Sequence, residues 1–290
     1  MGLRVSEGGE LMRGAWGLGL GTWGVLVLLV AFGDRSFGLA QGPSPRPQAP
    51  DKPQLSGFVE IPVGPFVMGA DRGRDPMALD NERWSPAQAE GSVELPGFFI
   101  SRHEVTVAEF AMFAQSRTWT VDPRALSAPP DHPVTYVSWP DAIAYCRWLQ
   151  TRLQGLPPGW RVTLPTEAQW EKAARGSDRR RFPWGDEVRN DRANVGTAGP
   201  VAAGRLACPE CAHGLTDMAG NVWEWTRSPY QPYPYNEADD RAGLEADALW
   251  VIRGGHYGDP PQLVRTTARG AAEPGARRPF IGFRVVVSPQ

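Results

Sequence analysis

Residues 214–225 read GLTDMAGNVWEW, a run in which turn-forming residues lead directly into two tryptophans. The whole chain shares this character, with 33 Gly, 29 Pro and 12 Trp among its 290 residues. Gly and Pro favour turns, and tryptophans supply large apolar surfaces against which loops can pack. The composition therefore predicts a body of loops and turns around aromatic anchors, with few long helices. The sequence shows no internal repeat and no sign of a second domain.

The balance of residue types is that of a globular protein, with 41% hydrophobic and 21% charged residues. Without a leader, about 240 residues would remain, enough for one large domain with a substantial core. Lys and Arg number 30 against 32 Asp and Glu, which gives a net charge of -2. There is no polybasic run, so nucleic acid is not an expected partner.

The first 40 residues differ from the rest. Residues 18–32, LGLGTWGVLVLLVAF, carry no charge, and Arg4 and Arg13 precede them. Signal-peptide cores span about 7–15 residues and membrane-crossing helices roughly 18 or more, so this hydrophobic helix lies at the border. Residues 1–40 are therefore expected to be either a signal peptide, cleaved after Ala40, or a retained membrane anchor. Either way, the domain would be carried across the membrane.

A proline-rich linker is predicted for residues 41–56, of which 41–54 read QGPSPRPQAPDKPQ. Such a segment cannot build a core and favours extended conformations. It would tether the domain expected at residues 57–290.

Three later segments open with the same helix-start chemistry. In each, a hydroxyl residue is followed three positions on by Glu, Asp or Gln, so each side chain can bond the other's backbone amide. Gly176 follows the third segment as an expected helix end. The three pairs are Thr106 with Glu109, Ser138 with Asp141, and Thr166 with Gln169.

A hairpin is predicted near the start of the domain, where residues 58–69 read FVEIPVGPFVMG. Its strands would be 59–61 and 66–68, joined by a Gly64-Pro65 turn. Residues 179–212 and 229–249 are expected to be loops.

Nine motifs, in order, make the chain resemble the formylglycine-generating-enzyme, or sulfatase-modifying-factor, family over roughly residues 57–287. The resemblance implies an α+β fold related to C-type lectins, low in regular secondary structure and often stabilised by calcium. That family includes copper oxidases, sulfoxide synthases, periplasmic siderophore-maturation enzymes and exported proteins without demonstrated chemistry. The motifs are residues 61–69, 103–106, 132–134, 137–139, 164–171, 182–185, 214–225, 253–255 and 281–284.

One departure from the family pattern bears on the oxidase chemistry. In the copper oxidases two cysteines follow the Arg-Gly-Gly motif, which is residues 253–255 here, because paired thiolates hold Cu(I). Residues 256–264 contain no cysteine, and Asp259 stands where the first thiolate is expected. Copper is therefore not an expected cofactor, and formylglycine generation by the usual mechanism is not expected.

The chain has only three cysteines. Cys146 lies on the apolar face of the second predicted helix and is interpreted as a core thiol. Cys208 and Cys211 form a Cys-Pro-Glu-Cys sequence, which in an exported protein favours a local disulfide. A redox-active pair, or a zinc site that adds His213, are the alternatives.

Calcium is the cofactor that the resemblance implies. In the family, the segment matching residues 214–225 wraps a cation, here through the side chains of Asp217 and Glu224 and the carbonyls of Gly220 and Val222. Oxygen donors from one tight loop suit calcium. In the alternative interpretation, Asp217 caps a turn and Glu224 pairs with an arginine such as Arg253 or Arg284.

His256, Tyr257 and Asp259 are the candidate catalytic residues. They could line the groove in which family members hold substrate, with His256 as acid or base. A purely structural role is the alternative for His256 and Asp259. For Arg253, Arg269 and Arg284 we prefer a structural role, as buried partners of carboxylates.

These observations lead to a functional hypothesis. The chain is expected to be a binding or assembly-accessory protein of the cell envelope, periplasmic or on the extracytoplasmic face of the inner membrane. Its partner would be another envelope or periplasmic protein, and its N-terminal segment would contact the membrane. The alternative is a family enzyme with altered chemistry, such as oxidation of a small molecule or peptide at the His256/Asp259 groove.

Overall fold

The computed structural model describes residues 55–116, 119–240 and 248–289. The chain divides into two units, residues 1–49 and 50–290, and the described residues all lie in the second. The predicted leader lies outside the described residues, as does all but the end of the predicted linker. None of the helices in the described ranges is both long enough and apolar enough to cross a membrane.

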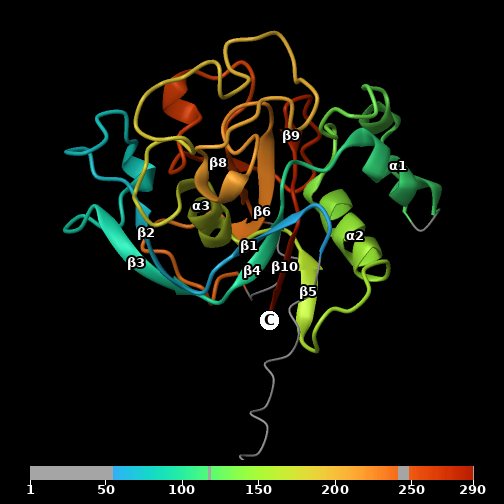
Figure 1. The fold of residues 1–290 in the computed structure, drawn as a ribbon, viewed down its shortest axis with the longest axis horizontal. Helices are drawn as coiled ribbons and strands as arrows, with labels where there is room; N and C mark the ends of the chain where they lie inside the picture. Colours follow the sequence, from blue (N-terminus) through green and yellow to red (C-terminus); the bar gives the residue numbers. More distant parts are fainter. Residues whose placement is uncertain (1–54, 117–118, 241–247, 290) are drawn as a thin grey trace, which may run out of the picture. The chain divides into compact units, whose positions relative to one another are not determined.

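The first sheet joins the two ends of the domain. It contains β1 (Phe58–Ile61), β4 (Phe98–Ser101), β10 (Val286–Pro289) and β5 (Trp160–Thr163), in the order β1-β4-β10-β5. All pairs are antiparallel, so the last strand of the chain lies between β4 and β5 (Figure 1). The apolar residues of β4 and β10 are buried, which closes the domain around its own C-terminal strand.

The predicted hairpin is wrong. β1 pairs with β4, whereas β2 (Gly64–Gly69) pairs along its whole length with β3 (Glu90–Leu95). The short Pro62-Val63 connection after β1 leads the chain from one sheet into another instead of folding β2 back on β1. The local sequence predicted the two strands correctly but not the strands with which they pair, because strand pairing depends on packing with distant segments.

The second sheet carries the 214–225 segment and has the order β8-β7-β6-β9. Neighbouring strands run antiparallel except β6 and β9, which are parallel. The strands are β6 (Trp223–Pro229), β7 (Trp250–Arg253), β8 (Arg269–Ala272) and β9 (Ile281–Gly282).

All three predicted helix starts are confirmed as capping boxes, in which hydroxyl and N3 side chain each bond the other's backbone amide. Gly176 ends the third helix with a φ of 64°. The helices are α1 (Val107–Gln115), α2 (Trp139–Gln150) and α3 (Glu167–Arg175), with short 3-10 turns η1 (Asp80–Glu82), η2 (Pro123–Leu126), η3 (Ala212–Gly214) and η4 (Pro261–Leu263).

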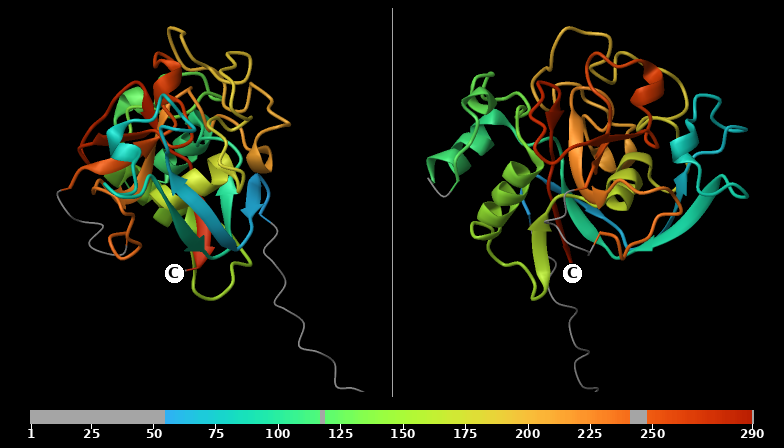
Figure 2. Two further views of the ribbon diagram at one scale, coloured as in Figure 1. Left: turned by 90° about the vertical axis from the view of Figure 1, so that its left-hand side faces the viewer. Right: turned by 180° about the vertical axis from the view of Figure 1, so that it is seen from behind.

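Helix α3 is buried along its whole length. It packs against β2, β6 and β7, while α1 and α2 lie side by side at one end of the domain and the β2–β3 hairpin lies at the other (Figures 1 and 2). The aromatic anchors are prominent, as Trp139 stacks on Trp250 with ring centroids 4.0 Å apart. The expected α+β fold, poor in regular secondary structure, is therefore confirmed.

Candidate functional site

The 214–225 segment forms a tight loop that ends in β6. Asp217, Gly220 and Asn221 have positive φ angles of 57°, 76° and 60°. A Cβ on Gly220 would lie 2.5 Å from the carbonyl oxygen of Asn194, so only glycine fits there. The loop is therefore held in a conformation that most residues avoid.

The two carboxylates of this loop already have protein partners. Glu224 is fully buried and accepts from Arg284 Nε at 2.6 Å, Arg284 Nη2 at 2.7 Å and Trp170 Nε1 at 2.7 Å. Asp217 Oδ2 accepts from the Gly204 amide at 2.5 Å. The structure thus contains the arginine pairing weighed as the alternative to calcium. Glu224 Oε1 accepts only from Arg284 among the described residues, and a carboxylate oxygen has room for a second contact.

A third carboxylate, Glu104, stands beside this loop. It is fully buried, and its Oε1 accepts from Asn221 Nδ2 at 3.0 Å. Its Oε2 is buried and has no hydrogen-bond partner within the described part of the chain. Burial first, then the charges of Asp217 and Glu224, raise the pKa of Glu104 well above its usual value.

The carboxylates around this loop bear on whether a cation could bind there. Glu104, Asp217 and Glu224 influence one another, and Arg284 is the one opposing charge acting on Glu104. An orphaned carboxylate oxygen beside an excess of buried negative charge suits a hard cation such as calcium. In the described ranges, however, no three His, Cys, Asp or Glu side chains converge as a metal-binding group, so backbone carbonyls would have to complete the site. Glu104 was not among the site residues predicted from the sequence.

His256 and Asp259 form a self-contained turn. Asp259 Oδ2 accepts from the His256 amide at 2.9 Å, and its Oδ1 lies 3.3 Å from His256 Nε2. The Gly258 amide donates to His256 Nδ1 at 2.9 Å. The ring also stacks on Phe280 and meets Tyr257 edge-on. Nδ1 therefore accepts a hydrogen bond within the turn, while Nε2 lies beside the carboxylate of Asp259.

The three arginines are buried ion-pair partners, which confirms the structural interpretation. Arg253 Nη2 donates to Glu167 and to Glu171, each at 2.8 Å. Arg269 also pairs with Glu167 and lies over the Tyr233 ring, 3.9 Å from its centroid. Both arginines favour the charged form of Glu167, whose pKa is lowered even though burial alone would raise it.

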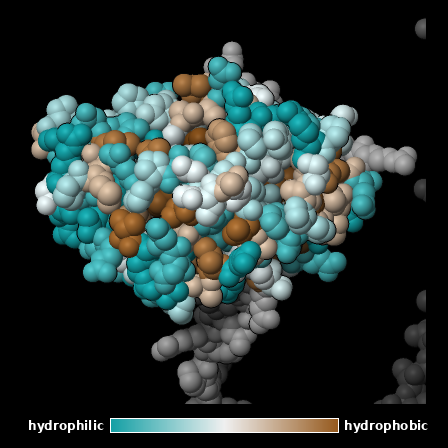
Figure 3. All heavy atoms as spheres, turned by 90° about the horizontal axis from the view of Figure 1, so that it is seen from above, coloured by the Kyte–Doolittle hydropathy of each residue, from teal (hydrophilic) through white to brown (hydrophobic). Residues whose placement is uncertain are grey.

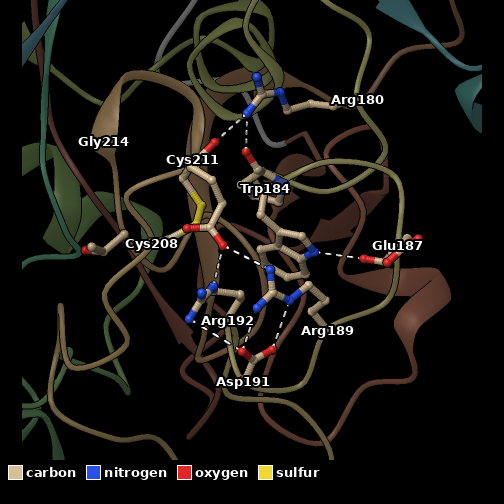
Figure 4. Close-up of a disulfide and its surroundings, with 12 residues drawn as sticks. Arg180, Trp184, Glu187, Arg189, Asp191, Arg192, Cys208, Cys211 and Gly214 are labelled. Atoms are coloured by element: carbon tan, nitrogen blue, oxygen red, sulfur yellow. Dashed lines mark hydrogen bonds and ion pairs between the residues drawn. A yellow bond between two sulfur atoms is a disulfide. The ribbon is translucent and has the colours of Figure 1, made fainter.

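The cysteines fall into two groups. Cys208 and Cys211 are joined in a disulfide, and both are buried. Arg189 and Arg192 converge on Glu210 of this small loop, and Figure 4 shows both beside the disulfide. As a disulfide, the pair supplies no thiolate to a zinc ion, and His213 has its pKa lowered by burial and by nearby Lys and Arg charges.

Cys146 is the free cysteine and is buried in α2. Burial raises the pKa of its thiol. It is a core residue rather than a reactive one.

Comparison with known proteins agrees with this architecture. A hercynine oxygenase of Mycolicibacterium smegmatis is 32% identical over 281 residues, which cover 81% of this chain and 62% of that protein. A formylglycine-generating enzyme of Streptomyces coelicolor is 30% identical over 308 residues, covering 84% of this chain and 91% of that enzyme. The chain spans about three fifths of the length of the hercynine oxygenases that it matches.

Among solved structures, PvdO from Pseudomonas aeruginosa superposes with a TM-score of 0.66 at 28% identity, over 80% of this chain and 94% of PvdO. Residues 44–289 match the family described as the sulfatase-modifying factor enzyme 1-like domain. This match covers most of the chain, and the chain therefore belongs to the sulfatase-modifying factor enzyme 1-like domain family.

Proposed function

We propose that this chain is a non-oxidase member of its family, acting as an exported binding or assembly-accessory domain in the cell envelope. The observation that carries the proposal is the state of the cysteines. Two are joined in a disulfide, and the third is a buried thiol in α2. None stands next to the Arg-Gly-Gly motif, where Asp259 instead bonds its own turn.

The lack of a cysteine beside the Arg-Gly-Gly motif matters because of the ligands that copper requires. Soft thiolate ligands select Cu(I), whereas carboxylates suit harder ions. Asp259 is a hard donor already committed to His256, and Cys146 is remote in sequence and buried. A copper centre of the formylglycine-generating kind would have to be built from groups that the described residues do not offer.

The direct test is an oxidase assay. The full chain is mixed with copper, oxygen, a reductant and a peptide carrying the sulfatase-type cysteine motif, and the peptide mass is followed. We expect no aldehyde product, while a genuine formylglycine-generating enzyme in parallel should give full conversion. Stoichiometric aldehyde formation by this chain would refute the proposal.

An accessory role is supported by the sequence of the N-terminal segment. The hydrophobic residues 18–32 would deliver the domain across the membrane, to the periplasm or the outer face of the inner membrane. The face seen in Figure 3 is mostly hydrophilic, with hydrophobic residues in small separate groups. Such scattered hydrophobic groups are ordinary on the surface of a folded domain, and the described residues of this face show no large apolar patch. Cross-linking in intact membranes should recover one reproducible partner, whereas repeated recovery of the chain alone would contradict this role.

We also propose that calcium stabilises the 214–225 loop. Asp217 and Glu224 would bind it through side chains, and Gly220 and Val222 through carbonyls. When bound, the ion would supply positive charge beside Glu104, whose buried Oε2 lacks a donor among the described residues. The role would be structural and not catalytic.

The enzymatic alternative at the His256/Asp259 groove is less well supported. An acid or base needs a nitrogen or oxygen free to meet the substrate, whereas Nδ1 of His256 accepts within its own turn and Nε2 lies beside the carboxylate of Asp259. We therefore assign His256 and Asp259 a structural role within the proposed function.

A further inference from the structure

A cavity of about 240 Å³ lies between the start of the 70–90 loop, the C-terminal end of α3 and the 179–186 loop. It is smaller than the roughly 300–1,000 Å³ of pockets that hold drug-sized ligands. Four arginines and four acidic residues line it, together with Ala70 and Thr267. The charged residues are Arg74, Arg175, Arg179, Arg181, Asp71, Asp75, Glu90 and Asp186.

Three arginines of this cavity, Arg74, Arg179 and Arg181, make few or no side-chain hydrogen bonds to described residues. Arg74 and Arg181 donate no side-chain hydrogen bond to any described residue, and Arg179 has only Glu90, at 3.5 Å. Arg181 Nε lies 3.8 Å from Asp186, which is beyond hydrogen-bond distance. By contrast, Arg253 and its carboxylate partners meet at 2.8 Å.

Arg175 lines the cavity with a buried side chain. This side chain is 4% exposed, and its two Nη groups donate to carbonyls and to Glu171. Its Nη2 also lies 3.8 Å from Glu90, and its buried Nε lacks an acceptor in the described part of the chain, as does the Nε of Arg253 in the core. Arg175 therefore belongs to the scaffold of the cavity, and the available donors are those of the cavity's other three arginines.

Two of the four acidic residues of the lining have partners outside the cavity, whereas Glu90 and Asp186 lie beside its arginines. The Glu90 carboxylate is 3.8 Å from the guanidinium of Arg175 and 3.5 Å from that of Arg179. Asp75 accepts from Arg265 at 2.7 Å and from the Met77 amide. Asp71 accepts from the Gly73 amide and Asp186 from the Arg181 amide. These carboxylates weaken the attraction of the cavity for an anion, but they leave N–H groups of Arg74, Arg179 and Arg181 available as donors.

We propose that this cavity binds a small oxyanion through the guanidinium groups of Arg74, Arg179 and Arg181. Guanidinium groups match the oxygens of phosphate, sulfate and carboxylate in geometry as well as charge. A tetrahedral ion such as phosphate offers oxygens in several directions and so fits arginines that come from two separate segments. The ligand is either the free ion or the phosphoryl end of a larger molecule.

The experiment is isothermal titration of the full chain with sodium phosphate and, separately, with phenyl phosphate, in Tris chloride without other oxyanions. We expect saturable one-site binding, weakened by about tenfold in Arg74→Gln/Arg181→Gln. The control Arg147→Gln/Arg161→Gln removes two exposed, remote charges and should change the Kd by less than about twofold. Asp186→Asn should tighten binding, since it removes a negative charge from the rim while keeping an acceptor for the Arg181 amide.

The variants avoid the bonds that hold the fold, because neither Arg74 nor Arg181 uses its side chain as a donor to described residues. Unchanged melting temperatures without phosphate would verify this. Tighter binding of phenyl phosphate supports the site and assigns it to an end group, and equal or weaker binding supports it for the free ion. Absence of saturable binding to the wild type, or equal loss in both double variants, would overturn the proposal.

Discussion

Replacing Arg253 with Met should show how strongly the Arg-Gly-Gly motif supports the fold. Arg253 is fully buried, and its Nη2 bridges Glu167 and Glu171 at 2.8 Å each. Removing one member of a buried ion pair costs about 3–5 kcal/mol, because the partner's charge stays buried. Glu167 keeps Arg269 and Glu171 keeps Arg175, so the lower end of this range is expected.

For a domain of this size, about 3 kcal/mol lowers the melting temperature by roughly 6–12 °C. The loss should also depend on pH. The pKa of Glu167 is lowered in the folded protein, so its pairing stabilises the fold above the unfolded pKa and is lost as pH falls through the folded pKa. Without Arg253 that contribution shrinks, so the gap between wild type and variant should be largest near neutral pH and narrow in acid.

The assay is chemical denaturation of both proteins across this pH range, with Arg161→Met as an exposed control. Arg161 has an exposed side chain on β5, and its loss should change the free energy of unfolding by less than about 0.5 kcal/mol. If Arg253→Met costs no more than this control, or if its cost is the same at every pH, the reasoning about the buried pair is refuted.

Three other changes test the site. Calcium at about a hundred times its Kd should stabilise the chain by about 2.7 kcal/mol, which raises the melting temperature by roughly 5–11 °C. Asp217→Gly, which suits the positive φ at this position, should abolish this increase in melting temperature as measured by calorimetry. An increase that persists in the variant would exclude Asp217 as a ligand. Replacing Cys208 and Cys211 by Ser should lower the free energy of unfolding by about 2 kcal/mol, as expected for so short a loop. Unchanged thermal stability would show that the disulfide does not stabilise the fold. His256→Ala should cost about 1–2 kcal/mol, because the ring loses the hydrogen bond from the Gly258 amide and its contact with Asp259. Partner capture from membranes should continue, and lost capture at full stability would point to a direct functional role.

Local chemistry in the sequence was enough to place the three helices. Each start depends on two side chains three residues apart, as in Thr106 with Glu109, and such short-range bonds can be read without knowing the rest of the fold. Strand pairing was another matter. β2 finds its partner β3 after an excursion of 20 residues through η1, and nothing local in either strand specifies that choice.

The candidate site divides in the same way. The residues of the 214–225 loop could be named because they are contiguous and carry a motif. Glu104 could not, because its role depends on a contact with Asn221 across 117 residues of sequence. The sequence left two arginines, Arg253 and Arg284, as possible ion-pair partners of Glu224. The structure shows that Arg284 pairs with Glu224, whereas Arg253 pairs with Glu171 of α3. The arginine-lined cavity was missed because its members come from segments far apart in the chain.

The buried sulfhydryl of Cys146 gives the protein an internal reporter of its own opening. With the other two cysteines joined to each other, a labelling reagent can reach this sulfur only when α2 separates from the core that covers it. The rate of its modification under native conditions would therefore report how often the domain opens, with no need to introduce another cysteine.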